Sequence, residues 1–119
     1  MLPPTHRQCY LEFKLALQEL QTTATTTGWQ PSVLRDHFQD VQQLFHSRIA
    51  SLSADDLAPE DVSRWQSVQT EIYKQMRLLE TDFMMLQASR SSATSSYRQT
   101  KVRDRIHTLI QYGEALLQL

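Results

Sequence analysis

The stretch VSRWQSVQTEIYKQMRLLETDFMML (residues 62–86) decides the fold class of this chain. Its seam residues recur at alternating steps of three and four, which places them on one helix face: Val62, Trp65, Gln69, Ile72, Met76, Leu79, Phe83 and Leu86. A seam of this length packs against other helices by inserting knobs into holes. The preceding residues 58–61 (APED) favour a helix start, because proline suits an early position and carboxylates complement the N-terminal dipole. We predict a helix that ends near Ser89 and is about 45 Å long.

Three further segments show apolar residues at helical spacing. The first covers residues 5–24, another starts near Pro31, and the last covers residues 97–117. Their stripes are, in order, Tyr10, Phe13, Leu17 and Leu20; Leu34, Phe38, Val41 and Phe45, with Leu52 as a candidate; and Val102, Ile106, Leu109, Gly113 and Leu116.

The segments between these helices have the composition of loops. Residues 22–27 are rich in threonine, a β-branched residue that loses side-chain freedom in a helix, and Gly28 then supplies a stop. Residues 51–58 are polar and acidic, and residues 90–96 are rich in serine. Connections this short favour antiparallel neighbours. We therefore predict an all-α fold, an antiparallel up-down four-helix bundle in which residues 1–119 form a single domain and the third helix outruns the first two.

Composition supports a folded, helical protein. Apolar residues make up 40% and charged residues 21% of the 119 residues, with only 2 Gly and 4 Pro. This is enough apolar surface for one core, and too few chain breakers for many short strands. Cys9 is the only cysteine, which excludes an intrachain disulfide. The N-terminus turns polar at once and the longest strictly apolar run is residues 83–86, so we expect a soluble cytoplasmic protein without a membrane span.

Charge is unevenly distributed along the chain. The net charge is -1, but residues 90–107 contain five basic residues and one acidic residue, Asp104. This segment is either a solvated basic face or a docking patch for an acidic partner. Nucleic acid is the weaker alternative, because the segment holds one aromatic residue, Tyr97, and no recognisable binding motif.

Residues that could carry chemistry are few and badly spaced for it. A di-iron bundle requires two Glu-x-x-His pairs, and the nearest match is a single pair, Asp104 and His107. We interpret the four histidines as surface or boundary residues. Cys9 lies on an apolar stripe, where a buried, unreactive thiol is expected. With two glycines no phosphate-binding loop can form. We therefore expect no enzymatic activity, no metal and no cofactor.

Several residues have more than one interpretation. Met76 is predicted to be core, whereas Met84 and Met85 flank the seam and are candidates for a partner contact. Gln69 either is a buried polar group that fixes register or marks a wet turn. Gly113 within an apolar stripe indicates a close helix approach or a bend. Trp29 and Trp65 are each either a cap on the core or, if exposed, an anchor for a partner.

Four stretches together resemble the heterocyst frequency control protein PatD family: HRQCYLEF (6–13), LRDHFQDVQQLF (34–45), QTEIYKQMRLLETDFMMLQASR (69–90) and RIHTLIQYGEALL (105–117). They cover about half of the chain and touch all four predicted helices. The resemblance implies a small regulator of filamentous photosynthetic bacteria that influences how many cells differentiate for nitrogen fixation. It also implies action through the tubulin-like division GTPase FtsZ. The family has no motif that marks functional residues, so no residue role follows from it.

Three hypotheses remain at this point. The first is a non-enzymatic regulator that binds a division-filament GTPase, and the second is a homo-oligomeric structural or adaptor protein whose third helix supplies a homodimer seam. The third is a metal- or cofactor-dependent enzyme on a bundle scaffold. For partner binding the candidate residues are Arg90, Arg98, Lys101, Arg103, Arg105, Met84 and Met85.

Overall fold

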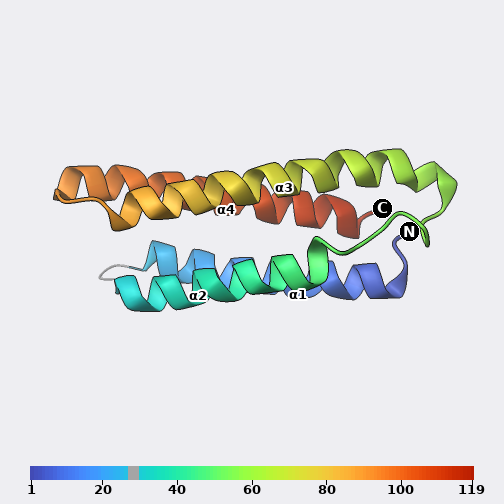
Figure 1. Ribbon diagram of the computed structural model, residues 1–119, viewed down its shortest axis with the longest axis horizontal. Helices are drawn as coiled ribbons and strands as arrows, with labels where there is room; N and C mark the ends of the chain where they lie inside the picture. The colour runs from blue at the N-terminus through green and yellow to red at the C-terminus, as the bar shows by residue number, and fades with distance from the viewer. Residues whose placement is uncertain (27–29) are drawn as a thin grey trace.

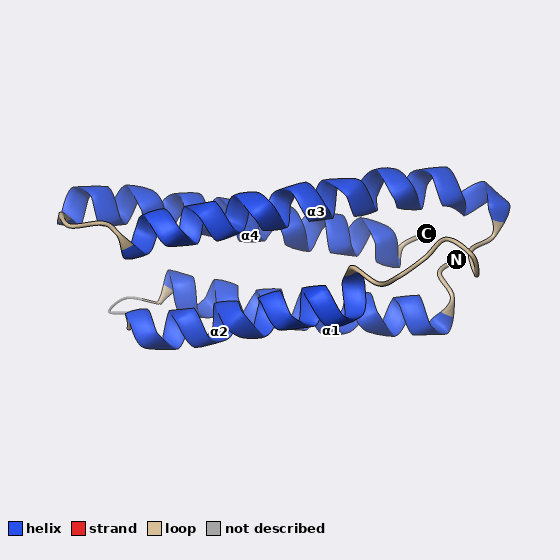
Figure 2. Cartoon of the chain, in the orientation of Figure 1, coloured by secondary structure: helices blue, strands red, loops and turns tan. Residues whose placement is uncertain are grey.

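The computed structural model describes residues 1–26 and 30–119. Within these ranges the chain contains helices and connecting segments, and no strand (Figure 2). The elements are α1 (Pro4–Thr25), α2 (Pro31–Leu44), the π-helical turn η1 (Phe45–Ile49), α3 (Pro59–Gln87) and α4 (Ser92–Leu117). The molecule is elongated, with extents of 50 × 20 × 20 Å. The all-helical prediction is confirmed.

The helices lie along the long axis of the molecule as two layers, α3 with α4 and α1 with α2 (Figure 1). The backbones of α1 and α2, of α1 and α4, and of α3 and α4 approach closely, whereas those of α2 and α3 stay further apart. As predicted, α3 is longer than α1 and α2, with 29 residues against 22 and 14. The start of α4 extends beyond the start of α2 in Figure 1.

One predicted helix end is off by one residue, and one predicted helix start is wrong. The first helix continues through the threonine run to Thr25, since Thr22, Thr23 and Thr25 each donate a hydroxyl hydrogen bond to the carbonyl four residues earlier. The fourth helix starts at Ser92, five residues before the predicted Tyr97, because Ser91 caps it: its Oγ accepts the Thr94 amide at 3.1 Å. The predicted stop at Gly28 and the Trp29 side chain lie outside the described residues.

The second helix ends in a wider turn that the apolar pattern did not predict. α2 gives way after Leu44 to η1, where the Ala50 amide donates to the carbonyl of Phe45, five residues back, at 2.8 Å. Leu52, a candidate for the second helical stripe, falls in the following connection, where it is half-buried against the core.

The predicted seam residues form the core. Trp65, Ile72, Met76, Leu79, Phe83 and Leu86 of α3 are buried together with the stripes of α1, α2 and α4, and Val62 is half-buried at the start of the helix. Cys9 is buried, as predicted.

A buried hydrogen-bond network crosses this core and joins three elements. Gln69 on α3 accepts the Tyr10 hydroxyl of α1 at 2.6 Å and donates from Nε2 to the carbonyl of Ile49, at the end of η1, at 2.9 Å. The indole of Trp65 donates to the Tyr10 hydroxyl at 3.0 Å. Gln69 is only 6% exposed, so of the two interpretations of this residue a buried polar group is confirmed and a wet turn is wrong.

The histidines do not all lie where they were predicted. His6 is buried, 4% exposed, and its Nε2 donates to the carbonyl of Ser53 at 2.8 Å, so the prediction of surface or boundary histidines is wrong for this residue. Its ring also packs edge-on against Trp65, which is buried at the same end of the core. His37 is half-buried, and His46 and His107 are exposed, as predicted.

Gly113 is buried within α4, but no close helix approach accounts for it. A Cβ added at this position would meet nothing within 4 Å, so the interpretation of a tight packing contact is wrong.

We predict that Gly113→Ala stabilises the protein by about 0.5–1 kcal/mol, because alanine loses less backbone entropy in a helix and its methyl group enters open space. Urea unfolding followed by circular dichroism measures this change. A loss of stability would show that α1 and α4 approach each other more closely than described.

A second prediction concerns Tyr10. Burial raises the pKa of its phenol above the ordinary value of 10.0, and the hydrogen bond from Trp65 opposes the shift. Since the unfolded chain releases this proton first, the contribution of neutral Tyr10 to stability is complete below pH 10 and is lost as the pH rises above it. Tyr10→Phe should cost about 1–3 kcal/mol at pH 7, because Gln69 and Trp65 lose a buried partner.

Urea unfolding at pH 7 and at several values above pH 10 separates the loss of the Tyr10 hydrogen bonds from the loss of the neutral phenol. The difference between wild type and Tyr10→Phe should shrink as the pH rises, because only the wild type loses the contribution of a neutral Tyr10. A difference that is constant with pH would contradict the burial of this phenol. Tyr97→Phe, which changes an exposed tyrosine, is the matched control.

Candidate partner-binding surface

The basic segment predicted from the sequence is divided by the structure into different environments. Arg90 is exposed in the connection between α3 and α4, and Arg98, Lys101 and Arg103 lie on the first turns of α4. Successive residues of an α-helix are 100° apart, so Arg103 points about 160° away from Lys101 around the helix axis. Arg98 and Lys101, three residues apart, share a face.

Arg105 is held within the fold. Its Nε donates to the Asp82 carboxylate of α3 at 3.0 Å, and its Nη1 donates to the Gln75 side chain at 2.9 Å. Both members of the ion pair are largely covered, with 26% and 14% of their side chains exposed. Arg105 therefore joins α4 to α3, and this structure does not present it to a partner in the way the sequence predicted.

Arg98 and Lys101 surround an exposed aromatic ring. Tyr97 is 56% exposed, and the Arg98 guanidinium carbon and the Lys101 ammonium nitrogen lie 5.4 and 5.6 Å from its ring centre. Cation–π attraction of this kind contributes about 0.5–1 kcal/mol at exposed sites and orders the long cationic side chains. We call these three residues the Tyr97 cluster. It presents two positive charges beside a large ring with a hydroxyl group.

The two methionines proposed for a partner contact face different directions. Met84 is 66% exposed and lines a hollow shared with α2, whereas Met85, the next residue around the helix, is 42% exposed and lies about 100° away. Only Met84 of the two lines this hollow.

The wider spacing of α2 and α3 leaves a groove between them. The rings of Phe38 and Phe83 stack across it, 4.4 Å apart at 27°, and close its floor. Two adjoining cavities of about 430 and 280 Å³ lie along it and share Arg35, Phe83 and Gln87. We call this feature the α2–α3 groove; its remaining lining residues are Pro31, Leu34, Phe38, Gln39, Gln42, Glu80, Met84, Leu86, Ser89 and Ser95.

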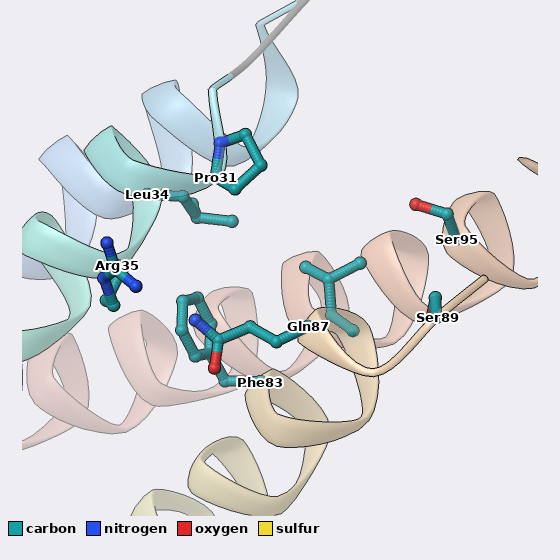
Figure 3. Close-up of a pocket in the computed structure, with 8 residues that line it drawn as sticks. Pro31, Leu34, Arg35, Phe83, Gln87, Ser89 and Ser95 are labelled. Carbon is teal, nitrogen blue, oxygen red and sulfur yellow. The ribbon is translucent and has the colours of Figure 1, made fainter.

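The larger cavity lies at the end of the groove next to the α3–α4 connection (Figure 3). Leu34, Phe83 and Leu86 supply its apolar wall, and Arg35 is the one charged residue among the eight that line it. Glu80 lines only the smaller cavity, further along the groove. The two ends of the groove therefore differ in charge.

Side chains that could bind a metal ion do not cluster in the described part of the chain. In residues 1–26 and 30–119, no three His, Cys, Asp or Glu side chains come together in a way that could hold a metal ion.

The His37 ring is hydrogen-bonded through Nδ1 to the Thr23 hydroxyl at 2.8 Å, which joins α2 to α1. Among the described helices, none has both the length and the apolar character needed to cross a bilayer.

The α2–α3 groove and the role of Arg35 were missed at the sequence level. Phe38 and Phe83 were assigned to apolar stripes, but a stripe says which face of a helix is covered and not how far apart two helices stand. Nothing in the sequence indicates that Arg35 lines a cavity, because an isolated arginine on a helix is normally a solvated side chain.

Comparison with known proteins adds no relative to this description. No family model matches this chain, and neither a curated protein nor a solved structure matches it.

Proposed function

We propose that this chain is an antiparallel up-down four-helix bundle that acts in the cytoplasm as a non-enzymatic regulator. In this proposal it binds the tubulin-like division GTPase FtsZ, modulates its assembly and thereby controls how frequently heterocysts differentiate. The partner and the process come from the PatD family that the sequence resembles. The surface comes from the residues of this chain.

The observation that carries the proposal is the Tyr97 cluster. Tyrosine and arginine are enriched where proteins bind one another, because each offers a large contact area together with hydrogen-bonding groups. Arg98 and Lys101 hold their charges at an exposed ring, while Arg105 two turns away is neutralised by Asp82. Arg98 and Lys101 thus form a local positive patch on a chain whose net charge is -1.

A protein partner accounts for this surface better than nucleic acid does. Binding to a phosphate backbone relies on many cations spread along a face, and here Arg103 points away from Lys101. A compact pair of cations around one ring suits a local acidic segment of another protein.

We predict that the double variant Arg98→Glu/Lys101→Glu reduces co-sedimentation with FtsZ filaments by about tenfold or more, because two attractive charges become repulsive. Wild-type binding should also weaken as salt is raised, since exposed charges are screened over about 10 Å at 0.1 M. The measurement is the bound fraction at several ionic strengths.

The matched control is Arg64→Glu/Lys74→Glu. It makes the same change in net charge at exposed positions on α3, whereas the Tyr97 cluster lies on α4. It should bind FtsZ within about twofold of wild type, a difference of less than 0.5 kcal/mol. If both double variants bind as the wild type does, while their circular dichroism shows intact helices, the Tyr97 cluster is not the contact.

A second candidate, a homo-oligomeric adaptor, is favoured by an apolar strip on the outer face of α3. Leu78 is 36% exposed and Met85 42%, and because they are seven residues apart they lie on the same side of the helix. A strip of this kind can pair with its own copy about a two-fold axis. The two candidates are compatible, since a dimer could also bind FtsZ.

Sedimentation velocity at tens of micromolar tests this candidate. A homodimer built on α3 predicts that wild type sediments as a dimer and that Leu78→Glu/Met85→Glu sediments as a monomer, because four carboxylates would then face one another. Leu15→Glu, at an exposed apolar residue of α1, is the control and should leave the dimer intact. Wild type that stays monomeric at this concentration contradicts the candidate.

A further inference from the structure

We propose that the larger cavity of the α2–α3 groove seats one large apolar side chain of a partner segment whose neighbouring residues are acidic. The inference rests on the proposed function, because it assumes that the chain binds another protein. It goes further by assigning the chemistry of the bound segment and its direction along the groove.

The apolar part of the site is a lined hollow rather than a flat surface. Its volume of about 430 Å³ falls in the range of ligand-binding pockets, and Leu34, Phe83 and Leu86 form its wall. These three side chains are themselves buried in the core, so the hollow is held open by packed residues. A single aromatic or branched side chain that fills such a hollow typically supplies the central anchor of an interface.

Positive charges outnumber negative ones near this cavity, although the exposed Asp36 follows the lining residue Arg35 in the chain. Arg35 is in its lining, Arg90 follows the lining residue Ser89 in the chain, and Arg98 lies one helical turn after the lining residue Ser95. No carboxylate is among the eight residues that line it (Figure 3). Residues of the partner that flank its anchor are therefore expected to be acidic on this side.

The groove also defines a direction. Beyond the shared residues Arg35, Phe83 and Gln87, the smaller cavity is lined by Glu80 and by the amides of Gln39 and Gln42. An acidic segment would be repelled at Glu80, whereas neutral polar residues could hydrogen-bond to the glutamine amides. The bound segment should thus be acidic toward the α3–α4 connection and neutral toward the middle of α2.

Fluorescence anisotropy with labelled 12-residue peptides tests the inference. The main probe has a block of Asp and Glu, one Phe, and then Ser and Gln. A second probe replaces Phe with Ala, and a third replaces the acidic block with Lys. We expect wild-type protein to bind the main probe about tenfold or more tightly than the Ala probe, as the loss of one large apolar group implies, and not to bind the Lys probe measurably.

Variants then assign the binding to the cavity. Ser95→Trp and Ser89→Trp each add a large side chain at the cavity wall, and Arg35→Glu reverses the charge in the lining. Each should weaken binding of the main probe by about tenfold. Arg64→Glu is the charge-matched control and should change it by less than about twofold. Circular dichroism and a thermal melt check that each variant is folded, and two cavity-filling variants are used because one of them could unfold.

Two outcomes would overturn the inference: equal affinity for the Phe and Ala probes, or unchanged affinity in the folded cavity-filling variants. The first outcome would show that the cations attract any acidic chain without an anchor. Because the peptide assay contains no FtsZ, its result is independent of the partner proposed above. Peptides that bind as expected while FtsZ does not bind would support the cavity and contradict only the named partner.

Discussion

Burial of a glutamine and a tyrosine in an otherwise apolar core is the constraint from which the arrangement of the helices follows. Gln69 receives the Tyr10 hydroxyl and donates to the Ile49 carbonyl, so α1, α3 and the end of η1 must meet at one point. An unpaired buried amide or hydroxyl costs about 1–3 kcal/mol, so a slip of any of these elements along the axis would be penalised. Apolar seams alone tolerate such slips, because one leucine resembles another in the next turn. The network therefore specifies the register that the seam leaves open.

The π-helical turn belongs to the same constraint. Widening the helix after Leu44 leaves Ile49 buried and its carbonyl within reach of Gln69, while the Ala50 carbonyl accepts the Tyr73 hydroxyl at 2.7 Å. The C-terminal end of η1 is thus hydrogen-bonded to side chains of α3, although the backbones of α2 and α3 stay apart. In the middle of α2 the stacked rings of Phe38 and Phe83 bridge the same gap. The α2–α3 groove is the space that these bridges leave open.

The sequence predicts the helices and the buried faces well, because apolar spacing reports directly which side of a helix is covered. It does not predict η1. A π-helical turn contains one more residue than an α-helical turn but is built from the same residue types, so the apolar pattern does not distinguish the two. It misplaces the start of α4, because serines are typical both of loops and of helix caps, and only the bond from Thr94 to Ser91 distinguishes the two. It treats Arg105 like its basic neighbours, although Asp82, 23 residues away in the chain, neutralises it. Distances between helices depend on packing of all side chains together, so the groove was not predictable.

In the proposed binding, charge and apolar surface at the α3–α4 end have complementary roles. Exposed cations such as Lys101 raise the rate of encounter with an acidic partner, but they are screened by salt and hold it only weakly. An apolar side chain held in a hollow mainly slows dissociation, because it must be rehydrated on leaving. A surface that used Arg98 and Lys101 alone would bind any acidic chain, and one that used the cavity of Leu34, Phe83 and Leu86 alone would bind any apolar one. Together they require both features in one segment, and a small helical protein can be selective in this way.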